Sequence, residues 1–343
     1  MRYKPKKKLR IIALMREDLI PPDTLEGIEN KEKQEWRTEY DVVSTLRGMG
    51  HEVRPVGVGS ELGPIREAVE EFKPHVAFNL LEEFDGYPLF DQHVVSYLEL
   101  QKQKYTGCCP RGLTLTRDKA LAKTILAYHR IHVPRFAVFP VNRKVVRPKR
   151  LRFPLFVKSL SDEGSAGIAQ ASIVRDDEKL KERVNFIHRQ NETPAIAEEY
   201  IEGREIYVGV IGNERLQAFT PWELVMPNLP DGAANIATGK VKWDLEYQKK
   251  VGLVTKPAEL EEQAKREFKR LSKRVYRILG LSGYARIDYR LAEGGLIYLL
   301  EVNPNPQIAH EEDFADSAEH CGLTYEALLQ KILTLGMSYD PIR

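Results

Sequence analysis

The sequence predicts a mixed α/β protein, in which a doubly wound parallel sheet comes first and an α+β region follows. Apolar runs alternate with helical patterns over about the first hundred residues, which is typical of β-α-β units. From Thr116 onward, short β-like runs replace this alternation. Near the end of the chain, Gly294 and Gly295 separate two β-rich runs, which predicts a hairpin.

Hydrophobic spacing defines the elements of the first region. Its apolar runs have the length of buried strands, and Ile65, Val69 and Phe72 recur at helical spacing. In chain order we expect a strand at 9–15, a helix near 36–49, a strand at 52–58, a helix around 65–72 and a strand at 75–81. We therefore predict one α/β domain over residues 1–105.

The second region begins with a helix that opens at Thr116. The strands expected after it are "VPRFAVF", "FPLFVKSL", "GIAQASIV", "AIAEEYI" and "EIYVGVIG". Segment 226–252 is rich in Pro, Gly, Asn and Lys without periodicity, which predicts a long loop that covers a site. An amphipathic helix around 268–278 follows it. We expect two α+β subdomains, 106–197 and 198–343, with 226–252 as a lid.

Composition excludes several classes of protein. The 52 basic and 50 acidic residues leave a net charge of +2, which argues against a nucleic-acid-binding protein. The basic clusters at 1–10 and 142–152 are interpreted as a solvated tail and a solvated loop. The three cysteines lack zinc spacing, and no apolar run approaches membrane length. We expect a cytoplasmic protein without a membrane partner.

The predicted hairpin brings charged residues face to face. If Gly294 and Gly295 form a two-residue turn, facing residues have numbers that sum to 294 + 295 = 589. Asp288 then faces Glu301, and Arg286 faces Asn303. Side chains alternate along a strand, so these four share one face. The other face, predicted to be core, carries Ile287, Tyr289, Leu300 and Val302.

This polar face predicts a metal site. A solvated surface is the simpler interpretation, but like charges directly opposite each other destabilise a sheet. A hard divalent cation would remove that repulsion, and Asp, Glu and Asn oxygens suit magnesium. Arg286 next to them could hold a phosphoryl oxygen or an oxyanion. The register alone therefore predicts a magnesium–nucleotide site.

A small-residue loop follows a strand that contains a lysine. Lys158 lies in an apolar strand, where a lysine needs an anionic partner. Residues 163–167 then form a loop between strands, which differs from a Walker P-loop because that loop leads into a helix. Backbone N–H groups of such a loop can close over phosphates.

These motifs together resemble the ATP-grasp superfamily, and within it the D-alanine–D-alanine ligase group. The resemblance runs from about Tyr105 to Leu335. It rests on seven motifs in order: "YTGC", "TRDKALAK", "FPLFVKSLSDEGSAGI", "EEYIEGREIYVGVIG", "KVKWD", "GLSGYARIDYRL" and "LLEVNPNP". It implies an ATP-grasp fold, in which two α+β subdomains clasp ATP after the N-terminal domain.

The resemblance also implies roles for individual residues. Two lysines and the small-residue loop would contact the phosphates of ATP, three hinge residues the adenine, and a glutamate the ribose. The lid lysine would reach the γ-phosphate, and the arginine the transferred phosphoryl group. The implied ATP-binding residues are Lys119, Lys158, Glu163, Gly164, Ser165, Ala166, Gly167, Glu198, Tyr200, Ile201, Glu205 and Lys242; the metal ligands are Asp288, Glu301 and Asn303; the catalytic residues are Arg286, Lys242 and Ser165.

The implied reaction is ATP-dependent ligation of a small carboxylate to an amine through an acyl phosphate, with two magnesium (or manganese) ions. The substrate segments depart from the D-alanine ligase pattern. Gln307 stands near the position of an expected glycine, and the acids at 311–313 would repel a second carboxylate. We therefore expect a ligase that does not join two D-alanines, with a cationic or uncharged acceptor. A homodimer is left open.

Two other functions are weighed against this one. A non-catalytic ATP-binding protein would have no need of Arg286 as an oxyanion partner. An NAD(P)-dependent oxidoreductase is suggested by "VGVGSELG", but its glycines miss the dinucleotide spacing by one and follow the second strand.

Overall fold

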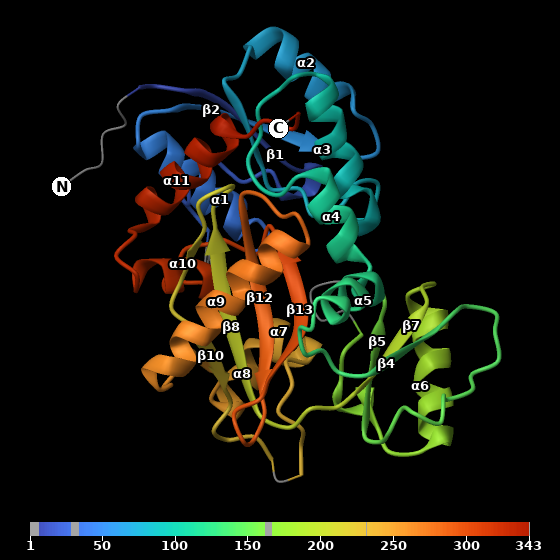
Figure 1. Ribbon diagram of the computed structural model, residues 1–343. Helices are drawn as coiled ribbons and strands as arrows, with labels where there is room; N and C mark the ends of the chain where they lie inside the picture. Colours follow the sequence, from blue (N-terminus) through green and yellow to red (C-terminus); the bar gives the residue numbers. More distant parts are fainter. Residues whose placement is uncertain (1–6, 29–33, 162–166, 231, 343) are drawn as a thin grey trace.

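The computed structural model describes residues 7–28, 34–161, 167–230 and 232–342, without the side chains at 242 and 243. The described chain contains three sheets (Figure 1). A parallel sheet lies at the top of the view, the largest sheet at the centre and a smaller lobe at the lower right. The mixed α/β class predicted from the sequence is confirmed.

The N-terminal sheet is parallel, with strand order β2-β1-β3. Its strands are β1 (Arg10–Arg16), β2 (Glu52–Val58) and β3 (Val76–Asn79), and its helices are α1 (Arg37–Gly48), α2 (Gly63–Phe72) and α3 (Asp91–Leu100), with short 3-10 turns at Glu17–Leu19 and Pro88–Phe90. The five elements predicted over residues 9–81 are present. The five central residues of strand β1 are buried because helices cover both faces of the sheet.

Two helices lead into the smaller lobe. Helix α4 (Pro110–Arg117) ends where Asp118 caps α5 (Lys119–Tyr128) by accepting the N–H of Leu121. The predicted helix at Thr116 is therefore two helices joined at Asp118.

The smaller lobe is an antiparallel sheet in the order β4-β7-β5-β6, with α6 packed on it. Its elements are β4 (Phe136–Phe139), β5 (Leu155–Ser159), β6 (Ile173–Val174), α6 (Asp177–Gln190) and β7 (Ala195–Glu199). The expected strand "GIAQASIV" is wrong for most of its length. A 3-10 turn at Gln170–Ser172 occupies its centre, and only two residues pair with β5.

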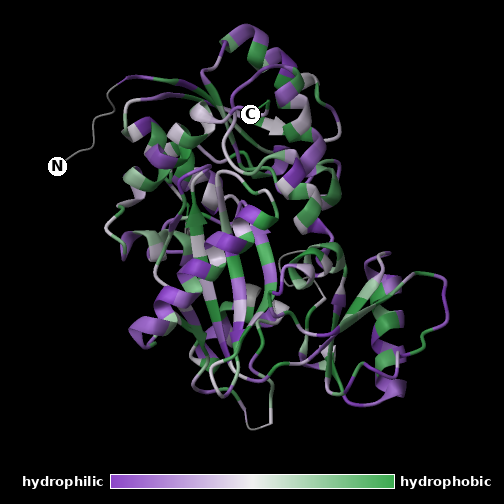
Figure 2. Cartoon of the chain, viewed as in Figure 1, coloured by the Kyte–Doolittle hydropathy of each residue, from purple (hydrophilic) through white to green (hydrophobic). Residues whose placement is uncertain are grey.

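The largest sheet contains the strands that position the site. Its order is β11-β10-β8-β12-β13, and β9 pairs with β8. The strands are β8 (Arg204–Ile211), β9 (Gln217–Ala218), β10 (Trp222–Val225), β11 (Val254–Pro257), β12 (Tyr284–Leu291) and β13 (Ile297–Pro304). The predicted amphipathic helix is α9 (Glu262–Ile278); it packs on β8 through Phe268 and Val275 and turns a hydrophilic face outward (Figure 2).

Segment 226–252 is not the structureless loop that the sequence predicted. It contains α7 (Gly239–Trp243) and α8 (Leu245–Val251). Thr238 caps α7 by accepting the N–H of Val241, and Asp244 caps α8 by accepting that of Tyr247. Both helices are too short to produce a readable hydrophobic period, so only their caps mark them.

The C-terminal helices connect the largest sheet to the N-terminal sheet. Helix α10 (Asp313–Glu319) packs on β8, whereas α11 (Tyr325–Ser338) packs on α1 and β3. One continuous core therefore contains Ile11 of β1 together with Leu328 and Ile332 of α11. No helix in the described ranges is long and apolar enough to span a membrane.

Candidate active site

The hairpin of β12 and β13 has the predicted register at its polar residues, although its turn differs. Asp288 pairs with Glu301 and Arg286 with Asn303. Closer to the turn, however, Tyr289 pairs with Leu299, because the loop holds three residues between Ala292 and Leu296. A bulge between Asp288 and Tyr289 restores the predicted register.

The bulge also changes which residue enters the core. Leu299 is buried, whereas Leu300, which was predicted to be core, is half-buried. The predicted two-residue turn was wrong. Gly294 and Gly295 do adopt positive φ, but a three-residue loop uses such glycines as readily as a two-residue loop, so the glycine pair did not determine the loop length.

Arg286, Asp288 and Asn303 form one hydrogen-bonded cluster. Arg286 donates from Nε and Nη2 to the two oxygens of Asp288, at 2.9 Å each, and Asn303 Nδ2 donates to Asp288 Oδ2 at 2.8 Å. Burial raises the pKa of Asp288, and the charge of Arg286 opposes that rise. The Arg286 guanidinium lies 4.5 Å from the ring centre of Tyr207 and 3.7 Å from Asp313 Oδ2.

Two lysines from different elements meet at Glu301. Lys158 Nζ, on β5, lies 3.1 Å from Glu301 Oε2, and Lys119 Nζ, at the start of α5, lies 3.3 Å from Oε1. Burial alone would raise the pKa of Glu301, but Lys119 and Lys158 outweigh it and hold that pKa well below its usual value. The structure thus brings three predicted site residues together from three segments of the chain.

A third lysine belongs to this cluster and was missed by the sequence reasoning. Lys123 is buried, lies 3.3 Å from Glu198 Oε1 and donates to the carbonyl of Leu300. Lys158 approaches the same oxygen of Glu198 at 3.9 Å. The signal was available in the sequence, because Lys119 and Lys123 are four residues apart and so share one face of a helix.

A second missed residue, Arg290, holds the predicted ribose carboxylate. Arg290 Nη2 lies 2.8 Å from Glu205 Oε2, and Tyr207 OH donates to Glu205 Oε1 at 2.9 Å. Since the Tyr207 ring also contacts Arg286, the predicted ribose and phosphate residues form one connected network across β8 and β12. Arg290 lies two residues beyond Asp288, so strand alternation could have indicated it.

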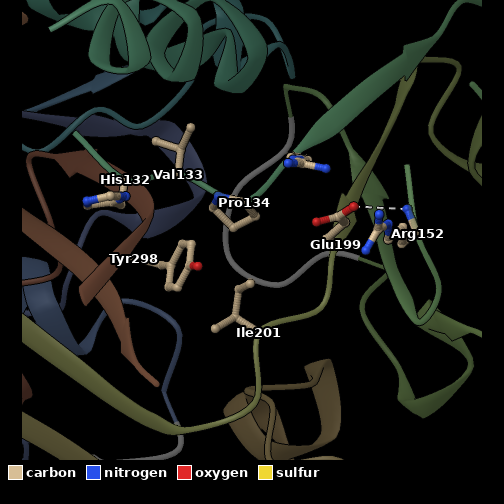
Figure 3. A pocket seen from close by; sticks show the side chains of 8 residues that line it. His132, Val133, Pro134, Arg152, Glu199, Ile201 and Tyr298 are labelled. Atoms are coloured by element: carbon tan, nitrogen blue, oxygen red, sulfur yellow. Dashed lines mark hydrogen bonds between the residues drawn. The ribbon is translucent and has the colours of Figure 1, made fainter. Parts of the chain in front are cut away.

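The predicted adenine hinge begins within β7, at Glu198, and continues into the two residues after the strand. Glu198 pairs with Lys123 of the lysine cluster. The next side chain, Glu199, lines a pocket (Figure 3). Ile201, Pro134 and Tyr298 also line that pocket. Glu199 accepts the backbone N–H of Arg152 at 2.9 Å, and Tyr200 lies 5.9 Å from the guanidinium of Arg290.

Some predicted residues lie outside the described part of the chain. These are Glu163, Gly164, Ser165 and Ala166, together with the side chain of Lys242. The backbone of Lys242 belongs to α7. Gly167 has φ +69°, and its carbonyl accepts a hydrogen bond from Arg183.

The residues of the hairpin suit magnesium. Asp288, Glu301 and Asn303 supply hard oxygen atoms from one face, and the hydrogen bond from Asn303 Nδ2 leaves its amide oxygen available. Arg286 and the lysines neutralise the two carboxylates in this state. Within the described ranges, no set of three His, Cys, Asp or Glu side chains is placed to hold a metal. A metal at the hairpin would therefore need the amide oxygen of Asn303 as a third ligand beside Asp288 and Glu301.

The segment after Asn303 contacts α1 of the N-terminal region and the residues just before α4. Asn305 has φ +49°, and its side-chain oxygen accepts the N–H of Cys108 at 2.7 Å. Gln307 Nε2 lies 3.3 Å from Thr38 Oγ1 on α1. Of the predicted acidic patch, Glu312 pairs with Arg37 at 3.2 Å and Asp313 approaches Arg286.

The chain is similar in sequence to a known protein family and to curated proteins. The family described as "D-ala D-ala ligase C-terminus" matches residues 127–334. A curated D-alanine–D-alanine ligase of Moorella thermoacetica is 27% identical over 86% of this chain and 92% of its own, and an uncharacterized protein of Sinorhizobium fredii is 29% identical over 87% and 86%.

Solved structures show the same fold. A D-alanine–D-alanine ligase from Bacillus anthracis, complexed with ATP, superposes with a TM-score of 0.73 at 21% identity, covering 96% of this chain and 97% of that one. The VanG D-Ala:D-Ser ligase from Enterococcus faecalis gives 0.70 at 18% identity, covering 96% and 100%. The chain therefore belongs to the D-alanine–D-alanine ligase family of ATP-grasp enzymes, whose members are ATP-dependent, ADP-forming C–N ligases.

Proposed function

We propose that the protein joins a small carboxylate to an amine through an acyl phosphate, and that it does not join two D-alanines. One observation carries the proposal. Three buried lysines, an arginine and the hairpin carboxylates converge from α5, β5, β12 and β13 on one polar surface. So many buried charges are costly for a fold, which favours a role in binding and transferring an anionic group.

ATP would bind with its adenine at Glu198, Tyr200 and Ile201 and its ribose at Glu205. The phosphates would replace the carboxylates as partners of Lys119 and Lys158, and Lys242, Ser165 and the loop at 163–167 would cover them. Magnesium, two ions in this proposal, would be held by Asp288, Glu301 and Asn303 and would neutralise charge on the phosphates.

The chemistry then has two steps. An oxygen of the substrate carboxylate attacks the γ-phosphorus, the bond to the β–γ bridging oxygen breaks, and ADP leaves. The amine next attacks the acyl carbon, loses a proton, and expels phosphate. Arg286 would stabilise the negative oxygen of the tetrahedral intermediate, since its guanidinium is anchored by Asp288 and lies beside the predicted phosphate residues.

The acceptor segment supports a substrate other than D-alanine. Gln307 contacts α1, and Asp313 lies 3.7 Å from Arg286, where it would repel a carboxylate on an incoming acceptor. The solved structure titled as a D-Ala:D-Ser ligase indicates that this fold serves more than one acceptor.

The test is ADP release by the purified protein with magnesium, ATP and a panel of amino acids, hydroxy acids and amines. Arg286→Ala should lose turnover by about 100-fold or more while it retains ATP binding. Arg270→Ala, an exposed arginine on α9, is the matched control. Turnover with D-alanine alone, giving a dipeptide, would overturn the substrate proposal. ATP binding without turnover on any substrate would instead favour a non-catalytic ATP-binding protein.

A further inference from the structure

A pocket of about 390 Å³ adjoins the predicted adenine hinge, and the reaction proposed above does not use it. Four segments form it: the loop at 132–135 before β4, Arg152 before β5, the hinge residues Glu199 and Ile201, and Tyr298 on β13. Its volume lies in the range of pockets that bind small molecules, about 300–1,000 Å³. We therefore consider which ligand its walls would suit.

Alternate residues of the hinge contact the two sites. Glu198 pairs with the lysine cluster at 3.3 Å, and the ring centre of Tyr200 lies 5.9 Å from the guanidinium of Arg290. Both side chains thus contact the proposed nucleotide site. Glu199 and Ile201 line the pocket. An adenine held by the backbone of the hinge would leave these two side chains to the pocket.

One part of the pocket wall is apolar and partly aromatic. Pro134 and Ile201 contribute aliphatic surface, and Tyr298 contributes a ring whose centre lies 6.1 Å from that of His132. In Figure 3, His132 and Tyr298 lie on one side of the pocket and Glu199 on the other. Aromatic and proline rings offer flat surfaces, so this wall suits a planar group.

The other part of the wall carries positive charge. Arg135 and Arg152 are exposed, and neither guanidinium forms an ion pair with an acid in the described part of the chain. Glu199, the acid of the lining, already accepts the backbone N–H of Arg152 at 2.9 Å. Two guanidinium groups against one carboxylate leave a net positive charge. The exposed Lys149 and Arg150, shortly before Arg152, add to the positive potential.

We propose that this pocket binds a small planar organic anion, an aromatic carboxylate or phosphate. Its ring would lie against Tyr298 and Pro134, and Arg135 and Arg152 would hold its anionic group. Guanidinium groups bind carboxylates and phosphates alike through paired hydrogen bonds, so the chemistry defines a class of ligand. The site is separate from the lysine cluster that would hold the phosphates of ATP. The inference involves no reaction and does not rest on the proposed ligase function.

Calorimetric titration with phenyl phosphate tests the site in protein saturated with magnesium and a nonhydrolysable ATP analogue, which occupies the nucleotide site. Methyl phosphate, which has the same charged group without a ring, is the matched ligand. Arg135→Gln combined with Arg152→Gln removes both charges, and Arg189→Gln, at an exposed position on α6 of the same lobe, is the control. We expect the double variant to weaken phenyl phosphate binding about 10-fold or more, and the control to change it less than 2-fold.

Tyr298→Leu should weaken phenyl phosphate binding about 3-fold and leave methyl phosphate binding unchanged, because it removes the ring alone. Competition by the ATP analogue in the wild type would place phenyl phosphate in the nucleotide site and overturn the proposal. Equal affinities for phenyl and methyl phosphate, or for the wild type and the double arginine variant, would overturn it as well. Each variant should keep its affinity for the ATP analogue; loss of that affinity would show that the two sites are not separate, which also contradicts the proposal.

Discussion

Replacing Lys123 with methionine tests whether the buried lysine cluster depends on paired charges. Lys123 is 1% exposed, lies 3.3 Å from Glu198 Oε1 and donates to the carbonyl of Leu300. Methionine fills a similar volume, so Lys123→Met removes the charge and the hydrogen bond and leaves little cavity. Glu198, itself 3% exposed, then loses its nearest cation.

The expected loss of stability depends on Lys158, the cation that remains near Glu198. Removing one member of a buried ion pair typically costs about 3–5 kcal/mol, because the other charge stays buried without compensation. Lys158 lies 3.9 Å from the same oxygen of Glu198 and offsets part of that loss. We therefore expect the free energy of unfolding to fall by about 3 kcal/mol, toward the low end of the range.

Urea denaturation at pH 7.5 measures this change. Lys179→Met is the matched control, since the Lys179–Glu182 pair lies on the exposed face of α6 and should leave the denaturation midpoint unchanged. Adding Glu198→Gln to Lys123→Met should recover much of the lost stability, because no buried charge then lacks a partner. A double variant as unstable as the single one would refute the reasoning.

Three further predictions concern separate features of the chain. Glu39→Gln should be more stable than the wild type above pH 7, by up to about 3 kcal/mol. Because Glu39 is buried, its pKa is higher in the folded protein than in the unfolded chain, so the wild type loses about 1.4 kcal/mol of stability per pH unit as the pH rises from about 4.5 to 7, and the variant does not. Equal pH profiles of unfolding for the two proteins would contradict this prediction. Gly283→Ala should lower the free energy of unfolding by about 2 kcal/mol or more, since φ is +68° and a Cβ would lie 2.4 Å from the Gly107 carbonyl oxygen. The control, Gly48→Ala, should not destabilise the protein, because a Cβ there would have no atom within 4 Å. Thermal unfolding of both variants measures the difference. Arg290→Met should weaken ATP binding about 10-fold by releasing Glu205 from its 2.8 Å contact, and an unchanged Kd would argue against Glu205 as a nucleotide ligand.

The register at the polar residues of the hairpin was predicted correctly from an incorrect turn. The pairing of Asp288 with Glu301 was obtained from a turn that is one residue shorter than the real one. The bulge beyond Asp288 compensates for that residue, so a correct register came from two deviations that cancel. Sequence spacing alone does not reveal a bulge, because both alternatives place apolar residues on the core face.

The remaining features depend on long-range packing. Lys158 and Glu301 are 143 residues apart, and which carboxylate each lysine meets is decided by how the lobes pack. The buried carboxylate of Glu39, whose Oε2 has no hydrogen-bond partner among the described residues, likewise becomes visible only when β1, β3 and α1 are assembled. By contrast, helix and strand periodicity could have predicted Lys123 and Arg290 as site residues, because each shares a face with a predicted site residue.

Calorimetric titration of ATP, with and without magnesium, tests the central claim that β12 and β13 form a magnesium–nucleotide platform. The wild type should bind ATP more tightly with magnesium, and Asp288→Asn combined with Glu301→Gln should abolish that difference. Glu246→Gln, an exposed acid on α8, should retain it. An undiminished magnesium dependence in the double variant would place the metal elsewhere and contradict the account.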